Sequence, residues 1–230
     1  MIRALAALAM LCATAAHAGE VDKLNPTCPA SPDWSANKVM SFTPEKRDGR
    51  NILLAEGRVD NDVVAHLQDA LARNQPVDEI WFRSPGGNAE AGNAAGLVIR
   101  KAGIPTRIPA GWACFSACNF LFMGGPIRAV DPGGLFIVHM FTFTGDGGVI
   151  ATEAQRGYKE AVGVIADVEQ NSALLASQDN DFLIRMGVSR KLLTDIMYRQ
   201  KAVADASGDQ STRRCLTQDE LFRYNVANVR

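Results

Sequence analysis

Short apolar segments alternate with amphipathic segments from residue 51 onward, and this alternation is the clearest pattern in the chain. Buried strands are predicted for four apolar runs, at 52–59, 79–84, 105–111 and 135–141. Helices are predicted for the segments between them, at 60–74, 88–103 and 116–123. Strands that alternate with helices favour a parallel sheet with right-handed crossovers, so we expect an α/β domain.

The chain on either side of this region has a different pattern. Helical periodicity follows the last strand at 152–177, 180–187, 189–201 and 217–224. Residues 19–50 are polar and contain four prolines, which is typical of an extended arm, with one candidate strand at 38–43. We therefore expect an arm at 19–50 and one folded domain at 51–230.

The first 18 residues have the features of a secretory signal peptide. Arg3 precedes an apolar run from Ala4 to Ala16, and small residues follow up to Ala18. This run is too short to span a bilayer comfortably, so we expect cleavage after Ala18, no remaining transmembrane anchor, and a periplasmic or secreted protein. A lipoprotein signal centred on Cys12 is the less favoured alternative, because bulky residues precede that cysteine.

Composition limits the classes of partner. The chain has 24 Lys and Arg against 25 Asp and Glu, for a formal net charge of −1, and no block of like charge stands out. Such a chain lacks the basic footprint of a nucleic-acid-binding protein, so no nucleic-acid partner is expected. With 230 residues, it is long enough to form one sizeable hydrophobic core.

Export changes the interpretation of the cysteines. Removal of the signal peptide leaves Cys28, Cys114, Cys118 and Cys215, an even number that favours disulfides in an oxidising compartment. Three connectivities are open; Cys114 with Cys118 is one plausible pair, because residues four apart near a helix start can come within disulfide reach. A four-ligand zinc site is the alternative, but the spacings are irregular and no histidine lies beside them, so we expect no metal.

The sequence Ser-Pro-Gly-Gly at 84–87 ends one predicted strand just before a helix. Gly86 and Gly87 can adopt positive φ or approach a ligand closely, and exposed N–H groups at such a turn can bind an oxyanion or a phosphate. The motif lacks the Lys-Ser/Thr of a phosphate-binding loop. An ordinary turn without a ligand is the alternative.

Ser116 lies in Cys-Phe-Ser-Ala-Cys, where a strand is predicted to turn into a helix. A serine at this point could be a nucleophile, and the Ala117 N–H together with one from Gly86 or Gly87 could form an oxyanion hole. The alternatives are that Ser116 only caps the helix or is a small residue among buried neighbours.

A nucleophilic serine needs a base, and the chain has three histidines. His17 leaves with the signal peptide, and His66 lies at the margin of a helical apolar face, where a solvated surface role is expected. His139 lies inside an apolar strand, where a histidine is costly unless it is hydrogen-bonded. Because this strand follows the Ser116 helix, His139 is the candidate base. The alternative is a buried histidine that is hydrogen-bonded within the core and has no catalytic role.

Four segments in this order resemble the superfamily of the Clp protease proteolytic subunit and the signal peptide peptidases. They are LAEGRVD, EIWFRSPGG, CFSACNFLFMGG and GLFIVHM, and the likeness is closest to the exported, single-domain bacterial branch with a Cys-x-Ser-Ala-Cys region. The resemblance covers 51–141, and LTQDELFRYNVAN at 216–228 resembles the closing helix. It implies a ClpP/crotonase-like superhelix of ββα units with C-terminal helices. It also implies Ser116 as nucleophile, His139 as general base, and an oxyanion hole at Ala117 and the Gly86-Gly87 turn.

The chain departs from the pattern of this superfamily at one position. The acidic third member of the triad would fall just before CLTQDEL, where the chain has Arg213 and Arg214. The nearest upstream acid is Asp209. Either Asp209 folds back to His139, or the enzyme works as a Ser–His dyad, or catalysis is lost.

The function expected from these observations is that of an exported serine hydrolase, a peptidase that acts on peptides or proteins without a cofactor. A catalytically inactive scaffold that binds peptides or proteins in the same groove is the alternative. A coenzyme A-dependent crotonase enzyme is a third candidate, but export separates it from cytosolic acyl thioesters, and no paired glutamates appear at the positions where that class has its catalytic glutamates. Association into a homo-oligomer stays open.

Overall fold

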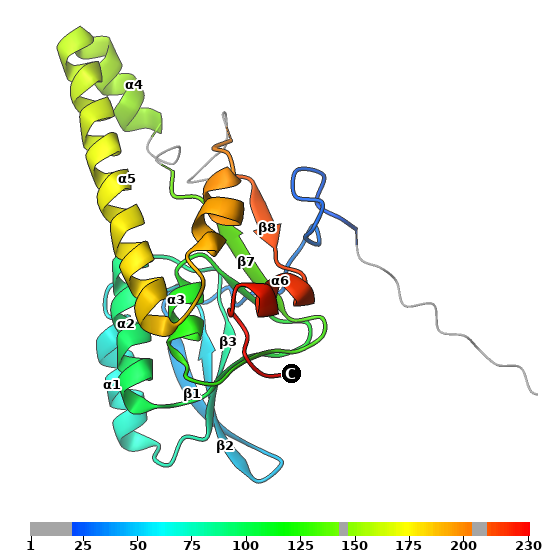
Figure 1. Cartoon of the computed structure of the whole chain (residues 1–230). Helices are drawn as coiled ribbons and strands as arrows, with labels where there is room; N and C mark the ends of the chain where they lie inside the picture. Colours follow the sequence, from blue (N-terminus) through cyan, green and yellow to red (C-terminus); the bar gives the residue numbers. More distant parts are fainter. Residues whose placement is uncertain (1–19, 143–146, 204–210) are drawn as a thin grey trace, which may run out of the picture.

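Two β-sheets form the centre of the structure (Figure 1). The computed structural model describes residues 20–142, 147–203 and 211–230. Within these ranges the larger sheet has the order β1-β2-β3-β4-β6, with β1 antiparallel to β2 and the other neighbours parallel. Its strands are β1 (Ser41–Arg47), β2 (Arg50–Glu56), β3 (Glu79–Arg83), β4 (Thr106–Ile108) and β6 (Arg128–Val130). The α/β class predicted from the alternation of segments is confirmed.

A second sheet, of order β5-β7-β8, carries the candidate catalytic residues. Its strands are β5 (Ala113–Phe115), β7 (Leu135–His139) and β8 (Arg213–Cys215). β5 and β7 are parallel, whereas β8 is antiparallel to β7 and pairs Arg213 with His139. The prediction of one parallel sheet is thus wrong in detail, because the chain leaves the first sheet after β4 to form β5.

Three helices pack on this framework: α1 (Val63–Arg73), α2 (Ala89–Ala102) and α3 (Cys118–Gly124). α3 is buried along its whole length, and α2 crosses it at very short range. A Cβ at Gly96 of α2 would lie only 2.4 Å from the Phe120 carbonyl oxygen of α3, so only glycine allows this approach. The close packing fixes α3, and with it the turn that carries Ser116.

The C-terminal helices differ from the pattern-based ranges. α4 (Gly147–Arg156) and α5 (Tyr158–Met186) are separated at Gly157, whose φ is 146°. The predicted break at 178–179 is wrong, because a helix can carry the polar run at 177–181 without interruption. The two helices pack together and project away from the sheets (Figure 1).

The segment predicted as a helix at 189–201 forms only short turns. A π-helical segment, η2 (Leu192–Ile196), leads into the 3₁₀ turn η3 (Met197–Arg199). The last helix, α6 (Gln218–Arg223), begins with a capping box between Thr217 and Glu220. Across the described ranges, none of the helices combines the length and apolar character required to cross a membrane.

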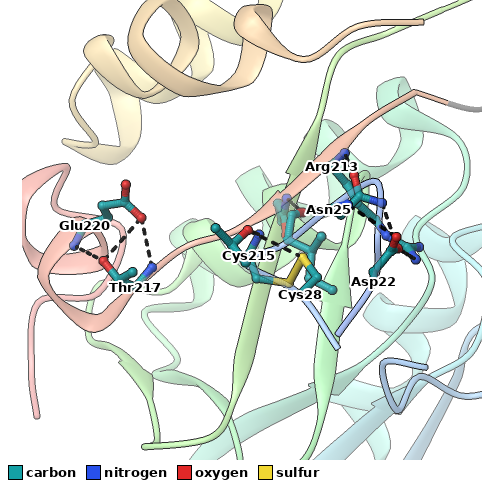
Figure 2. Close-up of a disulfide and its surroundings, with 10 residues drawn as sticks. Asp22, Asn25, Cys28, Arg213, Cys215, Thr217 and Glu220 are labelled. Atoms are coloured by element: carbon teal, nitrogen blue, oxygen red, sulfur yellow. Dashed lines mark hydrogen bonds and ion pairs between the residues drawn. A yellow bond between two sulfur atoms is a disulfide. The ribbon is translucent and has the colours of Figure 1, made fainter. Parts of the chain in front are cut away.

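The segment expected as an arm is joined to the domain in two places. Its last part forms β1, which pairs with β2 through a tight turn at Asp48 and Gly49, both at positive φ. Further upstream, Cys28 forms a disulfide with Cys215 of β8, which links residues 187 positions apart (Figure 2). The beginning of the arm is therefore tied to the strand that lies beside His139.

Polar contacts reinforce this connection (Figure 2). The Asp22 carboxylate pairs with the Arg213 guanidinium at 2.8 Å, and the Asn25 side-chain oxygen accepts from the Arg213 amide at 2.5 Å. The Thr27 hydroxyl accepts from the Cys215 amide at 3.1 Å. Together with the disulfide, these contacts hold β8 against the N-terminal segment.

Candidate active site

Ser116 lies at a sharp turn between β5 and α3. Its φ of 57° is in the left-handed region, which is uncommon for a residue other than glycine. A disulfide joins Cys114 to Cys118 across the turn, so both sides of Ser116 are linked covalently. The helix begins at Cys118 rather than at 116, and no side chain caps it. Ser116 is therefore not an N-cap, and its hydroxyl is directed elsewhere.

That hydroxyl contacts His139. The distance from Ser116 Oγ to His139 Nε2 is 2.7 Å, within ordinary hydrogen-bond range. The imidazole lies 4.6 Å from the ring of Phe115, which stacks in turn on Trp34 at 5.7 Å. The two residues predicted as nucleophile and base are thus in direct contact, and aromatic packing restricts the histidine ring.

The other ring nitrogen of His139 faces Ser211, which precedes β8. His139 Nδ1 is 3.1 Å from Ser211 Oγ, and the Ser211 hydroxyl donates to the Met140 carbonyl oxygen at 3.4 Å. When Ser211 directs its proton to that carbonyl, its oxygen can accept from Nδ1–H. Nε2 is then unprotonated and accepts from the Ser116 hydroxyl, which is the tautomer required of a general base.

Ser211 is the residue that the sequence reasoning missed. It lies just upstream of CLTQDEL, in the stretch where an acid was sought. The sequence reasoning considered only carboxylates in this stretch, so this serine was not among the candidates. Asp209, the residue considered for this role, lies outside the described residues.

The surroundings of His139 favour its neutral form. Burial lowers the pKa of His139 to about 4, and the positive charge of Arg213 acts in the same direction. The imidazole is therefore uncharged at neutral pH and can accept the Ser116 proton. A base with this pKa is weak, which fits a residue whose second partner is a neutral hydroxyl rather than a carboxylate.

This electrostatic setting predicts an unusual pH profile. If His139 is the base, kcat/KM requires the neutral imidazole and falls only as the pH drops through the pKa of about 4. Activity should persist at pH 5–6, where an unperturbed histidine with a pKa of about 6.5 is largely protonated. The measurement is kcat/KM as a function of pH between pH 3.5 and 8, with circular dichroism to check that the protein stays folded. An acid limb near pH 6.5 would contradict the assignment.

Two backbone segments near Ser116 line the same cavity, at Gly87 and at Ala117. Neither Gly87 nor Ala117 donates its amide to a protein acceptor within the described part of the chain. The Gly86 amide, in contrast, donates to the Ser84 hydroxyl at 3.1 Å. A Cβ on Gly86 would lie 2.7 Å from the Ser116 Cβ, so this glycine makes room for the serine. Among the described residues, the amides of Gly87 and Ala117 thus have no protein acceptor, and both residues line the cavity that Ser116 lines.

A cavity of about 530 Å³ connects these groups. Ser116, His139, Gly87 and Ala117 all line it, and α5 forms much of the opposite wall. Most of its other walls are apolar, formed by Phe120, Met123, Phe136, Val138, Phe141, Leu174, Leu175, Leu183, Leu192, Leu193 and Met197. This volume is typical of small-molecule and peptide side-chain sites.

The remaining predicted site residues are the cysteines. All four pair in the two disulfides, so the thiols that the zinc alternative requires are not free. Within residues 20–142, 147–203 and 211–230, no cluster of three or more His, Cys, Asp or Glu side chains could hold a metal ion.

Comparison with known proteins gives little further information. No protein-family profile matches the sequence, and no curated protein matches it either. Among solved structures, a mutant of ClpP1 from Listeria monocytogenes covers 77% of this chain and 88% of its own, with 15% sequence identity and a TM-score of 0.49. A likeness of this size assigns no role to any residue of this chain.

Proposed function

We propose that the protein is a serine hydrolase that cleaves peptides, with Ser116 as nucleophile and His139 as general base. The observation that carries the proposal is the 2.7 Å contact between Ser116 Oγ and His139 Nε2 in a cavity that two free amides also line. A serine, a histidine and two amides without a protein acceptor in one cavity are the combination expected of an acyl-transfer site, and this supports the proposal.

The proposed reaction follows from these positions. Ser116 Oγ attacks the carbonyl carbon as its proton passes to His139 Nε2, and the oxyanion accepts hydrogen bonds from the Gly87 and Ala117 amides. The imidazolium then protonates the leaving amine, and an acyl-enzyme remains on Ser116. A water molecule, activated by the neutral imidazole, hydrolyses this ester and restores the serine. The cycle requires no cofactor.

In this mechanism Ser211 is a positioning residue. It accepts from Nδ1–H and so fixes the tautomer and the ring orientation of His139. Replacing it with alanine should lower kcat about fivefold, because a neutral hydrogen bond contributes about 1 kcal/mol. Ser177→Ala, which changes an exposed serine on α5, is the matched control and should leave kcat unchanged.

A second substitution separates positioning from a merely structural role. Ser211→Asp places a carboxylate beside Nδ1, which should raise the pKa of His139 by about one unit or more. The acid limb of kcat/KM should then move to higher pH. An unchanged limb in a folded Ser211→Asp variant would contradict the role assigned to Ser211.

The second candidate function is that of a peptide-binding scaffold without catalysis. It is favoured by the weak basicity of His139 and by the lack of a carboxylate against its Nδ1 among the described residues. Hydrolysis of p-nitrophenyl butyrate and of denatured casein separates the two candidates. A hydrolase releases p-nitrophenol and casein fragments, whereas a scaffold binds casein and leaves it intact.

We further propose that the protein works outside the cytoplasm after cleavage behind Ala18. The two disulfides support this proposal, because such bonds persist in oxidising compartments. Ala18 itself lies outside the described residues. The ClpP/crotonase-like superhelix, peptide or protein substrates, and self-association into a homo-oligomer are retained as parts of the same proposal.

A further inference from the structure

The cavity beside Ser116 contains a buried carboxylate that the proposed mechanism does not use. Asp179 of α5 is 3% exposed and lines the same cavity as Ser116 and His139. On α5, residues 171, 175, 179 and 183 recur every four positions and all line this cavity, so one face of the helix follows its wall. Asp179 is thus an ionisable group within a mainly apolar wall.

Asp179 has little internal compensation. Its hydrogen-bond donor is the Tyr198 hydroxyl, at a long 3.5 Å. Among the described residues that line the cavity there is no lysine or arginine, and the other carboxylate is that of Glu90. Burial raises the pKa of Asp179 to about 7, against a smaller opposing effect of the Tyr198 hydrogen bond. A buried carboxylate is costly unless a cation or hydrogen bonds offset it, so the wall is complementary to a positive charge.

The carboxylate acts separately from the Ser116–His139 pair. The pKa of His139 is set by burial and by Arg213, without a contribution from Asp179. Nδ1 is already paired with Ser211. Asp179 is therefore not the missing acid of a triad, and its position fits a group that contacts the substrate.

We propose that Asp179 makes the cavity selective for a basic side chain, lysine above all, on the acyl side of the scissile bond. This inference rests on the proposed function, because it places the acyl group on Ser116. The aliphatic stem of lysine would pack against the apolar walls while its ammonium group reaches Asp179. An ammonium group there would lower the pKa of Asp179, and the ionised carboxylate would in turn attract the ammonium group.

The test compares two substrates that differ only in the ammonium group. They are the p-nitrophenyl esters of Nα-acetyl-lysine and Nα-acetyl-norleucine, assayed at pH 8, above the pKa of Asp179. The protein should favour the lysine ester in kcat/KM by at least about tenfold. Asp179→Asn should reduce this ratio to near one while the norleucine ester changes less than about threefold. Asp181→Asn, an exposed carboxylate on the same helix, is the matched control and should keep the ratio.

A binding measurement separates this inference from the proposed function. Acetyl-Ala-Ala-lysine amide and acetyl-Ala-Ala-norleucine amide are titrated calorimetrically into the Ser116→Ala variant, in which turnover plays no part. Preferential lysine binding without ester hydrolysis would support the cavity's selectivity and reject the hydrolase. Ester hydrolysis with equal or better use of norleucine, or an unchanged lysine preference in folded Asp179→Asn, would overturn the inference.

Discussion

Ser116→Ala should reduce hydrolysis of p-nitrophenyl butyrate to the uncatalysed background, a loss of about 10⁴-fold or more if the serine is the nucleophile. The Ser116 hydroxyl makes the 2.7 Å contact with His139, and alanine offers no atom to attack a carbonyl. The fold should survive, because the hydroxyl caps no helix and the turn is held by the Cys114–Cys118 disulfide.

The measurement is the initial rate of p-nitrophenol release by the two proteins at equal concentration. The thermal midpoint, followed by circular dichroism, checks that both are folded. Ser177→Ala is the matched control, since it removes a hydroxyl from an exposed position on α5. If the Ser116→Ala variant hydrolyses the ester at the wild-type rate, Ser116 is not the nucleophile.

Replacing His139 with alanine should lower kcat by about 10²–10⁴-fold, the usual range for general base assistance. The remaining activity would come from binding and from the Gly87 and Ala117 amides. Because His139 packs on Phe115 and contacts Ser211, the substitution should also lower the thermal midpoint through the cavity that it creates.

Two further variants separate loss of the base from loss of structure. His139→Gln fills most of the space without providing a base, so it should lose activity with a smaller loss of stability. His66→Ala removes the exposed histidine of α1, which lies 3.8 Å from Asp60, and should leave the rate unchanged. Activity near that of the wild type in a folded His139→Gln variant would contradict the role of His139.

The parts of the fold that the sequence predicts well are those with a strong local signal. The apolar run before Ser84 becomes β3, which is mostly buried in the core. The amphipathic stretch after Asn88 becomes α2, which buries its apolar face. Asn88 also caps α2, since its side chain accepts from the Ala91 amide at 3.0 Å.

The strands that sequence reasoning missed are three residues long. β5, β6 and β8 contain too few positions for an alternating pattern to appear. β8 additionally depends on partners remote in sequence: β7 on one side, and Cys28 through the disulfide. No local window contains that information.

The candidate site shows the same division. Ser116 and His139 could be named as candidates from the sequence, because Ser116 lies where a strand is predicted to turn into a helix and His139 is a polar residue in an apolar strand. Ser211 and Asp179 could not, since a serine in a polar loop and an aspartate in a helix look ordinary until their neighbours are known. The roles proposed for them rest on the contact of Ser211 with His139 Nδ1 and on the burial of Asp179 beside the cavity.

The most direct test of the central claim is covalent labelling of the purified protein with a fluorophosphonate probe, followed by peptide mapping in a mass spectrometer. Such a probe phosphonylates an activated serine, and its reaction does not depend on knowledge of the natural substrate. We predict one adduct on the intact protein, located on Ser116 and absent from the Ser116→Ala variant. An unlabelled protein, or an adduct on any residue other than Ser116, would contradict the proposed active site.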